Sequence, residues 1–90
     1  MATPVLGSRR SNLEIVADIL ALCENGGAGK TAIMYGANLS HTLLQKYLLS
    51  LSAHCLIQMD SAGKYRTTPQ GNQLLGDIKG VLRAINNGAT

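Results

Sequence analysis

The sequence predicts a small α+β domain that is mostly helical. Four segments with helical spacing of apolar residues each begin with a residue suited to cap a helix, and glycine or asparagine lies in loops between them. A strand–turn–strand pattern follows the third of these segments. Ninety residues are enough for one domain with one modest hydrophobic core. We therefore expect helices packed on one another with a single β-hairpin.

The composition favours a soluble intracellular protein. Apolar residues make up 46% of the chain and charged residues 14%, which suits a folded core and not a disordered tail. No apolar run reaches the roughly 18 residues of a membrane span, and residues 1–7 lack the pattern of a secretory signal. Cys23 and Cys55 lie in apolar segments, as reduced thiols do. The net charge of +3 is mildly basic.

The first helix is predicted to follow a flexible N-terminal arm, residues 1–10, which ends in two arginines. Ser11 and Glu14 form a capping box, in which each side chain bonds a free amide of the other residue. The helix runs to about Glu24 and ends at the glycine pair 26–27, since glycine adopts left-handed backbone angles without steric cost. Its apolar stripe consists of Leu13, Val16, Ile19, Leu20 and Cys23.

The stretch from Lys30 to Leu51 predicts two helices joined by a tight turn. Thr31 and Ser40 are each placed to cap a helix, because a side-chain oxygen can accept hydrogen bonds from the amides of the first turn. Between them, residues 36–39 (Gly-Ala-Asn-Leu) include two that tolerate left-handed backbone angles. This arrangement is a helix-turn-helix.

The helix predicted over residues 41–53 has two different faces at 100° per residue. Four large residues gather within about 100° and should face the core: Leu44, Tyr47, Leu48 and Leu51. The opposite face is mostly polar or small and carries one cation, with one large apolar exception. Its members are Thr42, Gln45, Lys46, Leu49 and Ala53, with His41 at the margin. A plain solvated face and a binding face are both consistent with these residues.

Residues 55–68 predict a β-hairpin directly after this helix. Two short strands flank the turn residues 60–63 (Asp-Ser-Ala-Gly). Lys64 lies at the tip, and Arg66 alternates onto the same face. A hairpin that follows a helix-turn-helix is called a wing, and its tip can lay cations along a phosphate backbone. Residues 11–68 are therefore predicted to form a winged helix-turn-helix domain.

The last helix is predicted over residues 69–86, with residues 87–90 as a frayed tail. Thr68 suits the cap, and Pro69 suits the first helical position, where a missing amide costs nothing. Apolar residues then recur at steps of three and four, the spacing of a coiled-coil seam. Because the other helices should fill the core, we expect this seam to pair with a second copy of the chain. The predicted dimer interface consists of Leu74, Leu75, Ile78, Val81, Leu82 and Ile85.

The Gly-Lys-Thr at residues 29–31 resembles part of a phosphate-binding loop but does not complete it. The pattern G-x-x-x-x-G-K-[ST] requires glycine at the place of Glu24, and it requires a strand where this chain has a helix. His41 and His54 are the only histidines, and no Cys or His pair has zinc-ligand spacing. The sequence therefore predicts no catalytic residue, no metal site and no cofactor.

Two runs of the sequence resemble a known family. Residues 30–40 (KTAIMYGANLS) and residues 65–71 (Y-x-T-T-P-x-G) are similar to small archaeal winged-helix proteins. The resemblance covers about residues 10–85. It implies dimerisation through a C-terminal antiparallel coiled coil and a role as a transcriptional regulator or DNA-binding chromatin protein. His54 and Cys55 depart from the family pattern, which has a basic residue and glycine there.

These observations predict a homodimer that binds double-stranded DNA in the cytoplasm, associated with the nucleoid. Helix 41–53 would enter a major groove, where Gln45 can pair with adenine and where Thr42 and Leu49 can touch a thymine methyl group. Wing residues 60–64 would lie on the phosphate backbone. We expect phosphate contacts from Arg9, Arg10, Lys30, His41, Lys46, Lys64 and Arg66. The alternative is a protein-interaction module, because the low charge and the outward Leu49 also suit a protein partner.

Overall fold

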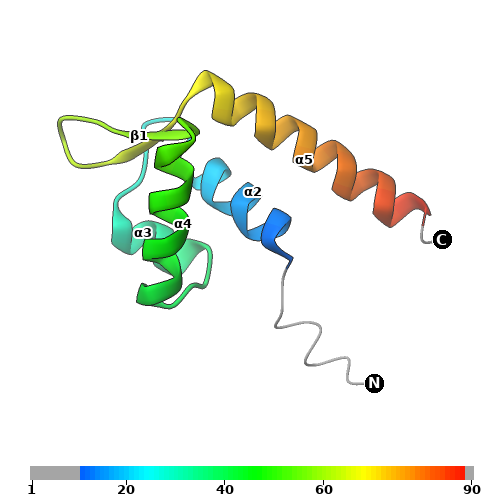
Figure 1. Ribbon diagram of the computed structural model, residues 1–90, viewed down its shortest axis with the longest axis horizontal. Coiled ribbons are helices and arrows are strands. Elements are labelled where there is room, and N and C mark those ends of the chain that lie inside the picture. The colour runs from blue at the N-terminus through cyan, green and yellow to red at the C-terminus, as the bar shows by residue number, and fades with distance from the viewer. Residues whose placement is uncertain (1–10, 89–90) are drawn as a thin grey trace.

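The computed structural model describes residues 11–88, and the side chains of residues 11–86. This part of the chain contains four helices and one two-stranded antiparallel sheet (Figure 1). The predicted mostly helical α+β fold, a winged helix-turn-helix, is confirmed. The elements are α2 (Asn12–Leu22), α3 (Lys30–Gly36), α4 (His41–Ala53), β1 (Ile57–Met59), β2 (Tyr65–Thr67) and α5 (Pro69–Gly88).

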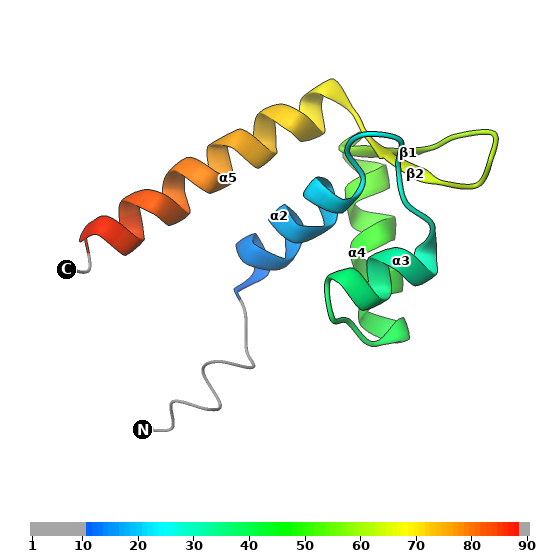
Figure 2. The same ribbon diagram turned by 180° about the vertical axis from the view of Figure 1, so that it is seen from behind.

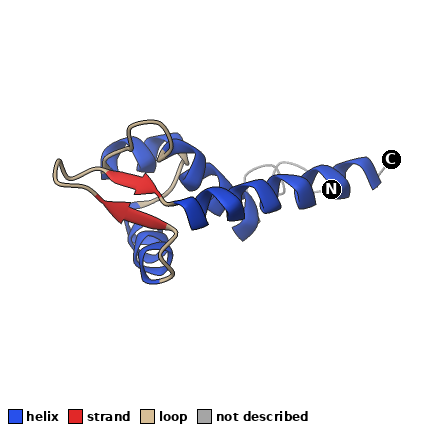
Figure 3. Ribbon diagram, turned by 90° about the horizontal axis from the view of Figure 1, so that it is seen from above, coloured by secondary structure: helices blue, strands red, loops and turns tan. Residues whose placement is uncertain are grey.

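Helices α2, α3 and α4 form one group, and the hairpin projects from one end of it (Figures 1 and 2). Helix α5 starts where the hairpin ends and packs along α2. Its C-terminal half extends beyond the other helices, which gives the molecule its longest dimension of 45 Å. The wing and the C-terminal end of α5 therefore lie at opposite ends of the molecule (Figure 3).

Side-chain caps begin α2 and α4 as predicted. The Ser11 Oγ accepts a hydrogen bond from the Glu14 amide at 3.2 Å, and the Glu14 Oε1 accepts one from the Ser11 amide at 2.9 Å. The Ser40 Oγ accepts from the Leu43 amide at 3.1 Å. These bonds satisfy amides that have no partner inside the helix, so they define where each helix starts.

The prediction that Thr31 caps the second helix is wrong. Helix α3 begins one residue earlier, at Lys30, and its N-cap residue Gly29 makes no side-chain hydrogen bond. Thr31 is an exposed residue of the first turn. The tight turn after α3 is confirmed, and its left-handed residue is Asn38, with φ of 55°.

Helix α2 is the central helix, with neighbours on two sides. It packs against α3 on one side and α5 on the other, and Ile19 and Leu20 are fully buried between them. The predicted stripe is wrong at Leu13, which is 44% exposed, and it missed Ile15, which is buried. A helix between two neighbours buries a wider face than a single amphipathic stripe, so the periodicity alone did not identify the buried residues.

The hairpin is anchored to the loop before α3. The two strands run antiparallel (Figure 3), and Gln58 lies opposite Arg66 and Met59 opposite Tyr65. The Ala28 amide donates to the Tyr65 carbonyl at 2.9 Å, and the Tyr65 amide donates to the Ala28 carbonyl at 2.8 Å. This bridge was not predicted, because its two residues are far apart in sequence. It attaches the wing to the helices.

The first strand is shorter than predicted. Cys55 and Leu56, which were expected to begin it, belong to the C-terminal cap of α4. The Leu56 amide donates to the Leu51 carbonyl at 2.9 Å, and Cys55 adopts a left-handed conformation with φ of 60°. This is a Schellman-type helix ending, in which glycine is the usual left-handed residue. The polypeptide therefore turns sharply from α4 into β1.

The prediction that the α5 seam lies free to pair with a second chain needs a correction. Leu75 and Ile78 are 2% and 3% exposed and belong to this chain's own core. Leu74 and Leu82 are partly buried against the same core. The expectation that the other helices fill the core was wrong, because α2 presents a second apolar face to α5. Val81 and Ile85, one and two turns further on, are exposed.

We expect Gly71→Ala to destabilise the domain. A Cβ at Gly71 would meet the Leu56 carbonyl oxygen and the Thr67 methyl group, so the start of α5 would have to move away from the hairpin. The expected loss in the free energy of unfolding is about 1–3 kcal/mol. Urea unfolding followed by circular dichroism measures it.

Gly76→Ala is the matched control in the same helix. A Cβ at Gly76 meets nothing within 4 Å, and alanine is a better helix former than glycine. This variant should gain up to about 1 kcal/mol. If both alanine variants are as stable as the wild-type chain, the close approach at Gly71 is not a constraint on the fold.

Candidate nucleic-acid interface

Helix α4 presents the predicted inner and outer faces. Leu44, Leu48 and Leu51 are buried, at 1%, 3% and 4% exposure. On the opposite face Thr42 and Lys46 are exposed, Gln45 is half-buried, and Leu49 is 72% exposed. The outer face is therefore not covered by any described part of this chain.

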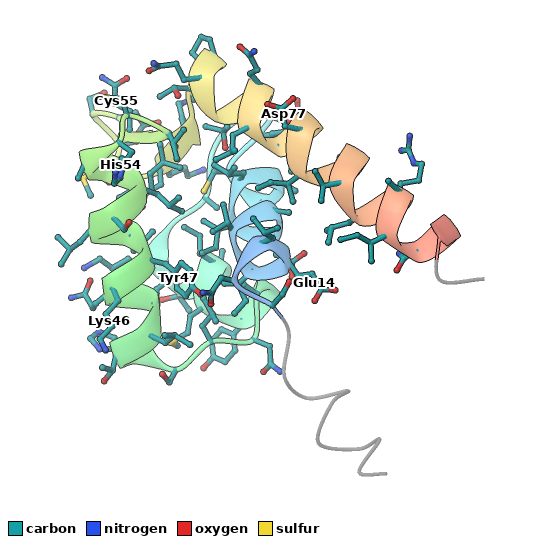
Figure 4. The ribbon with its side chains drawn as sticks, turned by 45° about the vertical axis from the view of Figure 1, so that its right-hand side comes forward. Glu14, Lys46, Tyr47, His54, Cys55 and Asp77 are labelled. Carbon is teal, nitrogen blue, oxygen red and sulfur yellow. The ribbon has the colours of Figure 1, made fainter. Side chains whose placement is uncertain are left out.

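Tyr47 ties α4 to the beginning of α2. Its hydroxyl donates a hydrogen bond to the Asn12 Oδ1 at 2.8 Å. Figure 4 shows Tyr47 between the two helices, whereas Lys46 points away from them. A shallow groove of about 340 Å³ follows this flank of α4 and is lined by Asn12, Leu43, Lys46, Tyr47 and Ser50. Lys46 therefore lies at one edge of the outer face.

The start of α3 lies against the start of α4 and brings two predicted phosphate contacts together. A small depression of about 170 Å³ is lined by Lys30, Thr31, Met34, His41 and Leu44. Lys30 and His41 are both exposed at its rim. A cation and an imidazole at adjacent helix starts form a suitable place for an anion, because helix N-termini also carry a partial positive charge.

Asp60 organises the wing and was not predicted as a site residue. One of its carboxylate oxygens accepts hydrogen bonds from the amides of Ala62 and Lys64, at 2.8 and 3.0 Å. The other accepts from the Arg66 Nε at 2.8 Å. The hydrogen bond from Arg66, followed by that from the Lys64 amide, lowers the pKa of Asp60 below its ordinary value of 3.8. An aspartate that opens a turn is the sequence signal that could have identified it.

The ion pair changes the charge of the wing. Arg66 was predicted to contact DNA phosphate together with Lys64, and its guanidinium is paired with the Asp60 carboxylate. Lys64 is exposed beside the pair. The wing therefore presents less positive charge than the sequence pattern suggested.

Helices α3 and α4 contain lysines and no acidic residue. Glu14 lies on α2 and Asp77 on α5, both away from the outer face of α4 (Figure 4). Helix α5 also carries Lys79 and Arg83, so positive charge is not confined to α3 and α4. Arg9 and Arg10, the two remaining predicted phosphate contacts, lie outside the described residues.

The described residues show no site for a metal ion. No group of three or more His, Cys, Asp or Glu residues between 11 and 88 is placed to hold one. Cys23 is buried, which raises the pKa of its thiol to about 11, and Cys55 is exposed; both are free.

Within residues 11–88, no helix is long and apolar enough to cross a membrane.

The sequence pattern of the winged helix-turn-helix family matches residues 9–86. The chain belongs to this family. The resemblance to archaeal winged-helix proteins is confirmed, because two relatives are uncharacterized proteins of Methanocaldococcus jannaschii. One is 35% identical over 77 residues, and the other is 29% identical over 79 residues. This winged helix-turn-helix chain spans 36% of the length of the first relative and 80% of the second.

Two solved structures share the winged helix-turn-helix fold. Sso10a-2, described as a DNA-binding protein from Sulfolobus solfataricus, has 31% sequence identity and a TM-score of 0.76. The similarity covers 87% of this chain and 84% of that chain. An O-methyltransferase of neocarzinostatin biosynthesis, NcsB1, has 31% identity and a TM-score of 0.51 over 82% of this chain. Only 23% of the methyltransferase chain takes part, so the likeness is to one winged-helix segment of it.

We expect the hydrogen bonds of Asp60 to survive acidification to below pH 3.8. A carboxylate with a lowered pKa in the folded state keeps its bonds above that pKa and loses them as the pH falls through it. In an NMR titration, the Arg66 Nε–H and the Ala62 amide should shift together, with a midpoint below 3.8. Asp60→Asn should abolish this transition. A midpoint at or above 3.8 would contradict the role given to Asp60.

Proposed function

We propose that this chain binds double-stranded DNA, with α4 in the major groove and wing residues 60–64 on the phosphate backbone. The observation that carries the proposal is the uncovered outer face of α4, with Lys30 exposed beside the first residue of that helix and Lys64 exposed in the wing that follows it. The similarity to Sso10a-2 along most of both chains supports it. A helix of this size fits the major groove of B-form DNA.

Three residues of α4 would contact base edges. The side-chain amide of Gln45 carries a donor and an acceptor, which match the N6 and N7 groups of adenine. Thr42 and Leu49 offer apolar contacts on the same side of the helix. Phosphate contacts would come from His41 and Lys46 of α4, from Lys30 of α3 and from Lys64 in the wing. Arg66 would contribute through the part of its guanidinium that Asp60 does not bind, and Arg9 and Arg10, outside the described residues, would add two further contacts.

The finer proposal is a dimeric regulator of transcription that acts at the nucleoid in the cytoplasm. The exposed Val81 and Ile85, on the half of α5 that extends past the domain, support pairing with a second copy. Leu74 and Leu82 would contribute their uncovered parts. A two-fold dimer would place its recognition helices about 34 Å apart along the DNA, or at a multiple of that distance.

A binding titration at several salt concentrations tests the DNA proposal. Each phosphate that a cation neutralises releases counterions, so the logarithm of the binding constant should fall by about 0.9 for each tenfold rise in salt per phosphate contact. We expect binding to short duplexes at about 50 mM salt and progressive loss above it. Failure to bind any duplex at about 50 mM salt would refute the proposal and favour a protein partner.

Variants at Gln45 and Lys64 separate base contact from phosphate contact. Gln45→Ala should relax the preference among sequences, because it removes the base-reading amide and leaves the charge unchanged. Lys64→Ala should weaken binding to all sequences alike and reduce the salt slope by about one. Equal effects of both variants on all sequences would show that Gln45 reads no base.

Sedimentation of a double variant tests the dimer. Truncation before Leu74 is unsuitable, because Leu75 and Ile78 belong to the core. Val81→Ser combined with Ile85→Ser changes two exposed side chains outside the core. We expect the wild-type chain to sediment at twice its 9.5 kDa mass and the double variant at that of a single chain.

Leu49→Ser, on the outer face of α4, is the control and should not change the sedimentation. A wild-type chain that sediments as a monomer, or a double variant that stays dimeric, would exclude this interface.

A further inference from the structure

Thr42, Gln45 and Leu49 form one continuous ridge along the outer face of α4. Their positions i, i+3 and i+7 lie on the same side of a helix. The ridge is roughly 10 Å long at 1.5 Å per residue, which matches about three base-pair steps of 3.4 Å. The ridge carries no charge. Lys46 is the one lysine or arginine of α4. It lies at the edge of the outer face, where it lines the groove that Asn12 and Tyr47 also line.

Leu49 is the unusual member of this ridge. It is 72% exposed, whereas the other leucines of α4 are buried or, for Leu43, 37% exposed at the groove beside α2. No described residue of this chain covers it. An apolar side chain gains free energy only by contact with another apolar surface. In the major groove that surface is the 5-methyl group of thymine.

We propose that Leu49 makes this protein a reader of pyrimidine 5-methyl groups, so that it distinguishes thymine from uracil in otherwise identical duplexes. The inference rests on the proposed binding of α4 in the major groove. An A·T pair presents the adenine N6 and N7 groups and the thymine methyl side by side, which suits an amide at Gln45 and an apolar group one turn away at Leu49. A ridge without arginine lacks the residue that most often reads guanine.

The same arrangement selects DNA over RNA. An A-form RNA duplex has a deep and narrow major groove that a helix cannot enter, and its uracils lack the methyl group. The ridge would therefore lose both its access and its apolar contact on RNA of the corresponding sequence. The chemical class of ligand is a B-form duplex that carries 5-methylpyrimidines in its major groove.

The experiment compares two duplexes that differ only in the methyl groups. The full-length chain is titrated with a short alternating dA–dT duplex and with the corresponding dA–dU duplex at the same low salt. Burial of one methyl group corresponds to about fourfold in affinity, so one or two contacts predict a preference of about 4- to 16-fold for the dA–dT duplex. Uracil substitution leaves the charge of the duplex unchanged, so the salt slopes should be equal.

Leu49→Ala tests whether the preference comes from this side chain. The variant should lose about fourfold of the preference, the share of one methyl contact. The double variant Thr42→Ser with Leu49→Ala, which also removes the methyl group of Thr42, should show a preference of about one. Leu43→Ala removes the same chemical group from the flank of the same helix and should keep the wild-type preference. Circular dichroism confirms that all three variants fold.

Three outcomes would overturn the inference in distinguishable ways. Equal, salt-dependent binding of both duplexes by the wild-type chain leaves DNA binding in place and excludes methyl reading. A preference that is unchanged in Leu49→Ala and also survives in the double variant shows that the shape of the duplex is read instead. If neither duplex is bound, the proposed function itself falls, and Leu49 belongs to a protein-binding surface.

Discussion

The structure depends on the burial of α2 between its two neighbours. Ile19 and Leu20 are completely enclosed there, so α3 and α5 are held against opposite sides of one helix. The wing is attached to the same helix, because the Thr67 amide donates to the Cys23 carbonyl at 3.1 Å and the Thr67 hydroxyl donates to the Leu20 carbonyl at 2.6 Å. A change in α2 would therefore disturb α3, the wing and α5 together, and α4 through the bond of Tyr47 to Asn12, although α2 contributes no residue to the proposed DNA contacts.

The candidate interface is built from elements that are fixed independently of any ligand. Tyr47 holds the flank of α4 to Asn12, and the bridge between Ala28 and Tyr65 holds the hairpin to the loop before α3. Asp60 then orders the wing tip, and its carboxylate partly neutralises the positive charge of Arg66. A rigid interface loses little conformational entropy on binding, so a surface with few cations can still bind by shape and apolar contact.

Helix α5 has two roles along its length. Its first half completes the core through Leu75 and Ile78, and its second half leaves the domain with Val81 and Ile85 exposed. This division separates what the fold requires from what remains available to a second copy of the chain. A coiled-coil spacing describes both halves equally well, because an apolar stripe can pack against a helix of its own chain or of another.

The features that depend on near neighbours could be predicted from the amino-acid sequence: the capping box of Ser11, the Ser40 cap, the turn at Asn38, the hairpin and the two faces of α4. Hydrogen bonds and periodicity within a few residues decide these. The sequence also identified the outer residues of α4, since that helix has core contacts on one side only. Four features became apparent only in the folded molecule: the burial of Ile15, the packing of Leu75 and Ile78, the bridge between Ala28 and Tyr65 and the ion pair of Asp60 with Arg66. Each of these depends on which segments come together in space, and the burial of α2 on two sides sets that arrangement.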